Sequence, residues 1–127
     1  MLITAKQSYV RQAPRKVRLV ASQVKKLSLE KAIKQLAVIE RRATVSILKV
    51  VKQAIANATN NLGLNMEDLV LKDIRVSDGP VYKRMRAVSR GRGHRIEKRT
   101  CHITVVLEKK EQEVEQKTER KSGKLEK

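Results

Sequence analysis

The sequence predicts an α+β domain in which three helices pack on a small antiparallel sheet and a long basic β-hairpin protrudes from it. Three observations support this fold class. Apolar residues recur at helical spacing between residues 14 and 62, and after Gly63 they alternate with other residues, as in strands. Residues 100–107 then form a dense run of β-branched side chains. Helices followed by strands that return on themselves are typical of α+β folds.

The first two elements are a strand and a helix. A loose strand pattern covers Leu2–Val10 and ends before Pro14. Proline is well tolerated at the first position of a helix, because the N–H that it lacks has no partner there. We therefore expect a helix over about 14–26. Its predicted buried face comprises Val17, Val20, Ala21 and Val24.

Two further helices are expected before Gly63. Ser28 is a suitable N-cap for a short helix with Glu30 in its first turn. The inward face of this helix is predicted to comprise Ala32, Ile33, Leu36 and Ala37. A longer helix is expected over about 41–61, because an apolar stripe continues through the whole segment. That stripe comprises Thr44, Ile47, Leu48, Val51, Ala54, Ile55, Ala58 and Leu62.

The second half of the chain carries strand patterns. Alternation over 69–76 predicts one strand, and the Ser-Asp-Gly-Pro cluster at 77–80 predicts a turn into another strand that starts at Val81. The clearest strand is 100–107, which returns along the sheet. One side of this strand is predicted to comprise Cys101, Ile103, Val105 and Leu107.

Length and composition limit the domain organisation. A chain of 127 residues suits one compact core, with little room for a deep catalytic pocket beside it. We expect a single domain over 1–107, which includes an extended hairpin over 80–106. Residues 108–127 mix acidic and basic side chains with few large apolar ones, so we expect a charged, disordered C-terminal tail, with a frayed helix as the alternative.

Charge is the strongest indication of function. The chain has 30 Lys and Arg against 13 Asp and Glu, a formal net charge of +17. Such a surplus on a small domain favours a polyanionic partner, with nucleic acid first and an anionic membrane surface second. No apolar run reaches the roughly 18 residues of a spanning helix, and the N-terminus lacks the apolar stretch of a secretory signal. The single cysteine fits a reducing compartment, so we expect a soluble intracellular protein.

The segment between Pro80 and Thr100 concentrates this charge, with eight basic residues and one acidic residue. Strand patterns flank it, and Gly91 and Gly93 are expected to supply the positive φ of a reversal. Neither face of such a hairpin can pack against protein, whereas Arg binds phosphate through a planar fork. The alternative is a solvated basic loop. The expected nucleic-acid contacts of the hairpin are Lys83, Arg84, Arg86, Arg90, Arg92, Arg95, Lys98 and Arg99.

A second basic group surrounds the start of the first helix, where the helix dipole also favours phosphate. The expected body contacts are Arg11, Arg15, Lys16 and Arg18. His102 is a further candidate phosphate contact, with a plain surface hydrogen bond as the favoured alternative. Only two aromatic residues are present, which argues against modules that stack unpaired bases on aromatic platforms.

Catalytic and metal sites are not expected. His94, Cys101 and His102 are the only soft ligands, and their spacing matches no zinc signature. Cys101 lies among apolar strand residues, which favours a core position over a nucleophile. The carboxylates are scattered and form no acid/base pair. We therefore predict that the protein is not an enzyme and needs no metal, cofactor or small-molecule substrate.

Several motifs resemble one known family. VRQAPRKVRLV (10–20), AIANA (54–58), the Gly-Pro and Lys-Arg pairs at 79–84, Gly-Arg at 91–92 and KRTCHITVV (98–106) are similar, in order and spacing, to large ribosomal subunit protein twenty-two of the bacterial or organellar type. The resemblance covers about residues 5–107. It departs at Ala87-Val88-Ser89, where the family usually carries Pro-Arg-Ala.

The resemblance implies a body on the outer surface of the large subunit and a hairpin that reaches through 23S-type rRNA to line the nascent-peptide exit tunnel. It also implies a role in subunit assembly, no chemistry of its own, and a place on a cytoplasmic or organellar ribosome. The implied partners are rRNA, neighbouring large-subunit proteins and the nascent polypeptide, without a membrane. The polypeptide would pass a hairpin tip formed by Arg90, Gly91, Arg92, Gly93 and His94.

Two other classes of function compete with this one. An architectural DNA-binding protein would lay a basic β-arm in a groove, and such arms favour an apolar wedge at the tip, which residues 90–94 lack. A small nucleic-acid enzyme would need an acid/base cluster or a metal site. The sequence therefore favours a structural RNA-binding protein.

Overall fold

The computed structural model describes residues 1–110, so the expected tail lies, from residue 111 onward, outside the described residues. Within these residues, three helices and a three-stranded antiparallel sheet confirm the predicted α+β class. The elements in chain order are β1 (Leu2–Val10), α1 (Pro14–Val24), α2 (Leu29–Val38), α3 (Arg42–Leu62), the 3₁₀ turn η1 (Met66–Asp68), β2 (Leu69–Ala87) and β3 (Gly93–Lys109).

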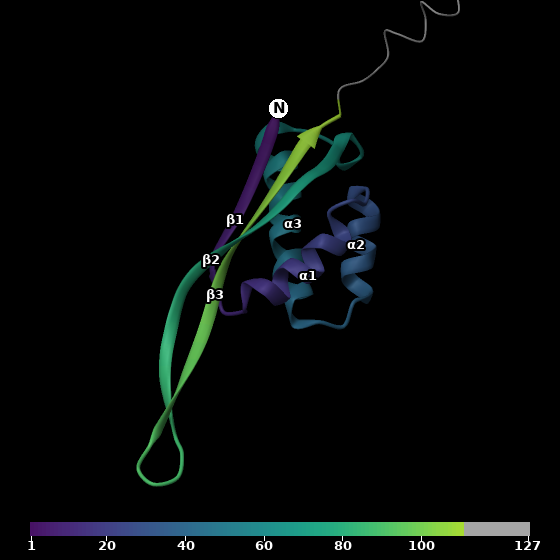
Figure 1. The fold of residues 1–127 in the computed structure, drawn as a ribbon. Helices are drawn as coiled ribbons and strands as arrows, with labels where there is room; N and C mark the ends of the chain where they lie inside the picture. Colours follow the sequence, from purple (N-terminus) through teal and green to yellow (C-terminus); the bar gives the residue numbers. More distant parts are fainter. Residues whose placement is uncertain (111–127) are drawn as a thin grey trace, which may run out of the picture.

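The sheet has the order β1-β3-β2, and the three helices cover one of its faces (Figure 1). The central strand β3 pairs with β1 from Leu2–Glu108 onward and with β2 from Leu69–Lys109 onward. Because β3 is bonded on both sides and covered by helices, its inward side chains are fully buried. Those side chains are the predicted set, Cys101, Ile103, Val105 and Leu107.

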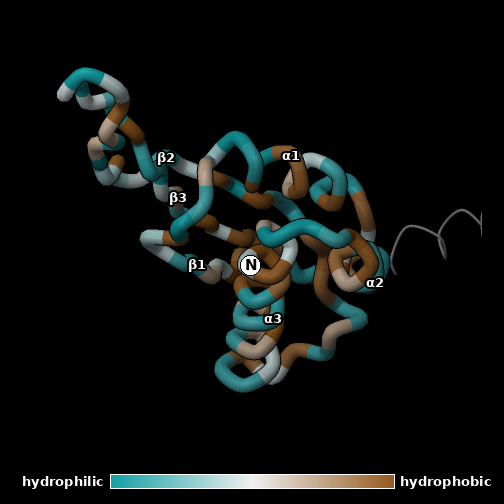
Figure 2. Tube along the Cα trace, turned by 90° about the horizontal axis from the view of Figure 1, so that it is seen from below, coloured by the Kyte–Doolittle hydropathy of each residue, from teal (hydrophilic) through white to brown (hydrophobic). Residues whose placement is uncertain are grey.

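The core lies between this sheet and the helices, where Figure 2 shows the hydrophobic positions gathered. The predicted buried face of α1 is confirmed in full. In α3, Gly63 ends the helix with a left-handed φ of 62°, a conformation that favours glycine. The core side chains that the helices contribute include Val17, Val20, Val24, Leu36, Ile47, Val50 and Val51.

Two predicted inward positions are wrong. Ala37 is exposed, because α2 touches the core along the narrow stripe of Leu29, Ala32 and Leu36, and Ala37 lies beyond its edge. Leu62 is also exposed, because it occupies the last position of α3. The apolar stripe of α2 is wider than the part of the helix that the core covers, and the apolar stripe of α3 is longer than the part that the core covers.

The predicted turn at 77–80 is also wrong, because β2 runs unbroken through this segment. Asp78 pairs with Cys101 and Val81 with Arg99, so Gly79 and Pro80 together oppose Thr100. This two-against-one arrangement is a β-bulge. The strands approach closely here: a Cβ on Gly79 would lie 2.5 Å from Thr100 Oγ1, and this hydroxyl donates a 2.6 Å hydrogen bond to the Pro80 carbonyl. Glycine and proline therefore interrupt the ladder without reversing the chain.

Candidate nucleic-acid interface

Beyond the bulge, β2 and β3 leave the body as a two-stranded arm, which we define as residues 80–99. Figure 1 shows it extending past the helices. Seven residue pairs form its ladder, from Val81–Arg99 to Ala87–Gly93, and every residue from 80 to 99 is exposed. The arm therefore contributes nothing to the core, and a ribbon of this kind is marginally stable on its own.

Basic side chains occupy both faces of the arm. Paired residues of an antiparallel ladder point to the same side, and successive residues point to opposite sides. One face therefore carries Arg84, Arg86 and Lys98. The other face carries Lys83, Arg95 and Arg99, together with Glu97, which pairs with Arg99 at 3.3 Å. Neither face is suited to packing against an apolar protein surface, as the sequence predicts.

The tip of the arm is a loop over residues 88–92. Arg92 N–H donates to Ser89 O at 3.4 Å, and the two residues between them, Arg90 and Gly91, have φ values of 60° and 67°. Positive φ at both central positions is the signature of a type I′ turn. The expectation that Gly93 supplies positive φ is wrong, because Gly93 lies in the ladder opposite Ala87.

The tip also differs from its predicted composition. Val88 belongs to the loop and is 48% exposed, and Met85, three residues before it, is 76% exposed. The sequence places no apolar side chain at 90–94, whereas the loop itself begins at residue 88. The end of the arm thus combines arginines with two exposed apolar side chains. A Cβ on Gly93 would overlap the Met85 thioether, so glycine leaves room for that side chain.

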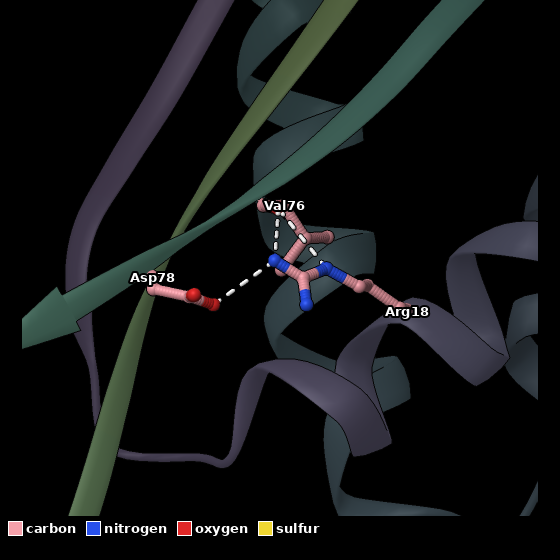
Figure 3. A network of polar contacts seen from close by, with 3 residues as sticks. All are labelled: Arg18, Val76 and Asp78. Atoms are coloured by element: carbon pink, nitrogen blue, oxygen red, sulfur yellow. Dashed lines mark hydrogen bonds and ion pairs between the residues drawn. The ribbon is translucent and has the colours of Figure 1, made fainter.

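An arginine of α1 links the body to the base of the arm (Figure 3). Arg18 donates to the Val76 carbonyl from Nε at 3.3 Å and from Nη2 at 3.1 Å, and it pairs with Asp78 Oδ1 at 2.9 Å. Arg18 is one of the expected RNA contacts, but its Nε and Nη2 groups already donate hydrogen bonds within the protein. Because its side chain remains half exposed, its other N–H groups still face solvent.

Tyr82 brings two further arginines together. The guanidinium carbon of Arg11 lies 5.7 Å from the centre of the Tyr82 ring, and that of Arg84 lies 6.0 Å from it. Arg11 precedes α1, whereas Arg84 belongs to the arm. The ring attracts both cations and holds them near one another.

These side chains border a concave hollow of about 860 Å³ between the base of the arm and the starts of α1 and α3, which we call the crook. Its lining includes no acidic residue and seven basic ones: Arg11, Lys16, Arg41, Arg42, Arg84, Lys98 and Arg99. The crook thus joins two of the expected body contacts to three of the expected arm contacts. Arg15, Arg18 and the remaining arm contacts lie outside it.

Sequence reasoning missed Arg41 and Arg42. Both stand at the start of α3, whose first turn holds no acidic residue. Cations are disfavoured at a helix N-terminus, where the dipole favours Asp and Glu. Two adjacent arginines at a predicted helix start are therefore a signal of an anionic ligand that could be noticed in the sequence.

His102 has a structural role in the sheet. Its Nδ1 accepts a 2.9 Å hydrogen bond from the Tyr9 N–H, and the two rings meet edge to face at 5.0 Å. Tyr9 lies in a bulge of β1 with a φ of 58°, so this bond supports a strained backbone position. The alternative of a surface hydrogen bond is therefore realised, and Nε2 of His102 keeps a hydrogen to donate.

The other chemistry-bearing groups of residues 1–110 include a buried thiol and a paired carboxylate. Cys101 is fully buried, and burial raises the pKa of its thiol. The Lys25 ammonium, 2.6 Å from Asp73, lowers the pKa of that carboxyl. Within residues 1–110 no three His, Cys, Asp or Glu side chains gather as a metal site would require. None of the helices in that range is long and apolar enough to cross a membrane.

Comparison with known families supports the resemblance seen in the sequence. The sequence model of the family described as ribosomal protein L22p/L17e matches residues 5–108. The matched range includes the whole arm, the crook and all three helices.

Proposed function

Because the chain belongs to the ribosomal protein L22p/L17e family, a structural component of the large ribosomal subunit, we propose that it binds 23S-type rRNA through its arm and its body. We further propose that it aids subunit assembly and that the tip of the arm lines the nascent-peptide exit tunnel. Its partners would be rRNA, neighbouring large-subunit proteins and the passing polypeptide, on a cytoplasmic or organellar ribosome.

One observation carries this proposal: the arm is exposed along its whole length and basic on both faces. A two-stranded ribbon without a core gains stability only from what surrounds it. A ligand that contacts both faces and neutralises them must be polyanionic and must enclose the arm. Folded RNA meets both conditions, because it can present phosphates around a cavity.

The proposed contacts follow from this geometry. Arginine forks on the two faces would bind phosphates on opposite walls of the cavity, and the small residues near the tip would let the backbone approach closely. The proposed RNA contacts are Arg11, Arg15, Lys16, Arg18, Lys83, Arg84, Arg86, Arg90, Arg92, Arg95, Lys98, Arg99 and His102. The polypeptide would meet residues 90–94.

The protein would act by organising RNA, with no catalysis, cofactor or small-molecule substrate of its own. Support comes from the placement of its reactive groups: the thiol of Cys101 is buried in the core, and the carboxylates of Asp73 and Asp78 are engaged in ion pairs. A buried thiol with a raised pKa is a poor nucleophile, the lowered pKa of Asp73 makes its carboxylate a weak base, and Arg18 holds the Asp78 carboxylate in an ion pair.

An architectural DNA-binding role is the second candidate, and the exposed Val88 and Met85 beside the tip favour it. Apolar side chains at the end of a basic arm can enter a base step and bend a duplex. The two functions differ in the nucleic acid that competes for the arm. Folded rRNA should displace the protein from duplex DNA at equal nucleotide concentration, and not the reverse.

Co-sedimentation tests the main proposal directly. The protein should sediment with large ribosomal subunits and remain there through washes at moderate salt. A purified large-subunit rRNA should also protect the arm from limited proteolysis. Release at the salt concentration that removes a nonspecific basic protein, or equal protection by duplex DNA, would contradict the ribosomal role.

A further inference from the structure

The crook is a second basic feature of the protein, located where the base of the arm meets the helices. We propose that it seats a sharply bent segment of RNA backbone, with several phosphates held at once, and that Arg41 and Arg42 are phosphate contacts in it. This inference rests on the proposed function, because it assumes that the ligand is RNA. It adds a site at the base of the arm and two residues outside the expected contacts.

The first support is the distribution of charge. Outside the crook, several cations of the chain have carboxylate partners, such as Arg18 with Asp78 and Lys25 with Asp73. Among the seven basic residues of the crook, only Arg99 forms an ion pair within residues 1–110, and its partner Glu97 does not line the hollow. So many unneutralised cations around one hollow repel one another, and an anion there relieves that repulsion.

The second support is that part of the crook is held in place by contacts within the protein. Tyr82 keeps the guanidinium groups of Arg11 and Arg84 at one ring, although they carry like charges. Gln12 Nε2 donates to the Arg42 carbonyl at 3.2 Å and to Ser46 Oγ at 3.4 Å, which fixes the segment before α1 to the start of α3. A preorganised site loses less entropy when the ligand arrives.

The shape of the crook selects the form of the ligand. Its cations come from three directions: the segment before α1 and its first turn, the start of α3, and both strands of the arm. A duplex presents its phosphates along a convex surface, so it would reach only one wall. A tight turn or a looped-out strand presents phosphates in several directions and can enter a hollow of about 860 Å³.

The double variant Arg41→Gln/Arg42→Gln tests the inference in the full-length chain. Its matched control is Lys31→Gln/Lys34→Gln, which removes two positive charges from exposed positions of α2, outside the crook. Both variants keep the complete arm. Binding is measured over a range of KCl concentrations with two probes: a folded large-subunit rRNA fragment and a base-paired RNA hairpin of equal nucleotide content.

The crook variant should lose about tenfold or more in affinity for the folded fragment. The slope of log affinity against log salt should become shallower by about 1.4 to 1.8, as expected for two phosphate contacts. The affinity of the crook variant for the base-paired hairpin should fall by no more than about threefold. The affinity of the α2 control for either RNA probe should also fall by no more than about threefold. Thermal unfolding monitored by circular dichroism should show the same transition for all three proteins.

Equal behaviour of the crook variant and the α2 control on the folded fragment would overturn the crook site while leaving the proposed function intact. An equal loss on both RNA probes would show that Arg41 and Arg42 act by general charge alone, which also overturns it. If polyglutamate displaced the folded fragment from the crook at comparable charge concentration, an acidic peptide would be the better ligand. Failure of the unaltered protein to bind folded rRNA would instead refute the proposed function.

Discussion

Shortening the arm separates its role from that of the body. The proposed variant replaces Met85–Arg95 by Asn-Gly, so that Arg84 and Ile96 flank a two-residue turn. The Val88 N–H donates to Arg92 O, and the antiparallel ladder alternates from there, which makes Arg84–Ile96 a hydrogen-bonded pair. Asn-Gly favours the type I′ turn that such a pair accommodates. The register of the remaining ladder is therefore preserved.

The expected effect on stability is small. The replaced residues are all exposed, and only three ladder pairs disappear. Cross-strand pairs contribute a few tenths of a kcal/mol each, and the shorter loop recovers part of that loss. The free energy of unfolding should change by no more than about 1 kcal/mol, and the urea m-value, which follows buried area, should stay nearly constant.

The expected effect on RNA binding is large. The replaced segment contains Arg86, Arg90, Arg92 and Arg95. If each contacts one phosphate, the slope of log affinity against log salt becomes shallower by about 3 to 4. A full-length variant with these four arginines changed to Gln is the matched control, since it removes the same charge at unchanged length. Both variants should show the same slope.

Urea unfolding and salt-dependent binding to a folded rRNA fragment measure the two effects. Loss of a cooperative transition in the shortened protein would refute the conclusion that the arm lies outside the core. An unchanged salt slope would refute the phosphate contacts. A shallower slope in the shortened protein alone would show that the length of the arm, and not its arginines, determines binding.

Three further perturbations address the body. Gly79→Ala should destabilise the protein by about 1 to 3 kcal/mol in urea unfolding, because the new methyl group would meet the Thr100 hydroxyl and backbone; unchanged stability would contradict the close approach. Lys25→Met should lower stability at neutral pH by about 0.5 kcal/mol. The lowered pKa of Asp73 means that this difference is present above the ordinary value of 3.8 and is lost as pH falls through the lowered pKa of the folded protein, so an equal difference near about pH 2 in thermal melts would contradict the pair. Cys101 should react with a thiol reagent at least about a hundredfold more slowly in the native protein than in urea, and rapid native labelling would contradict its burial.

Local patterns were sufficient to predict most of the fold. Helical spacing predicts the buried face of α1, and β-branched alternation predicts that of β3, because each pattern reports which side of one element is covered. The bulge at Gly79 could not be predicted in this way. Gly-Pro is compatible with a turn or with a bulge, and the choice depends on Thr100, which is brought opposite by the pairing of β2 with β3.

The candidate site shows the same division. Composition predicts which segments are basic, and therefore identifies the arm and the start of α1. Composition does not reveal which side chains each cation contacts. Arg18 pairs with Asp78, sixty residues away in the sequence, and Tyr82 brings Arg11 close to Arg84 of β2. The crook is a product of tertiary contacts, so no single segment of sequence indicates it.

The contacts at the base of the arm determine which residues of the arm lose conformational entropy when it becomes ordered. Thr100 and Pro80 lock the bulge by a hydrogen bond, and Arg18 joins the strand just before it to α1. Tyr82 then contacts an arginine from the body. These contacts set the direction in which the arm leaves the body before any RNA is bound, because all of them belong to the protein alone. If the arm binds RNA as proposed, the conformational entropy lost on binding falls on the pairs beyond Tyr82 and on the tip, which would adapt to the walls of the RNA cavity. A fixed base with an adaptable end lets one body position a long cationic ribbon without a core of its own.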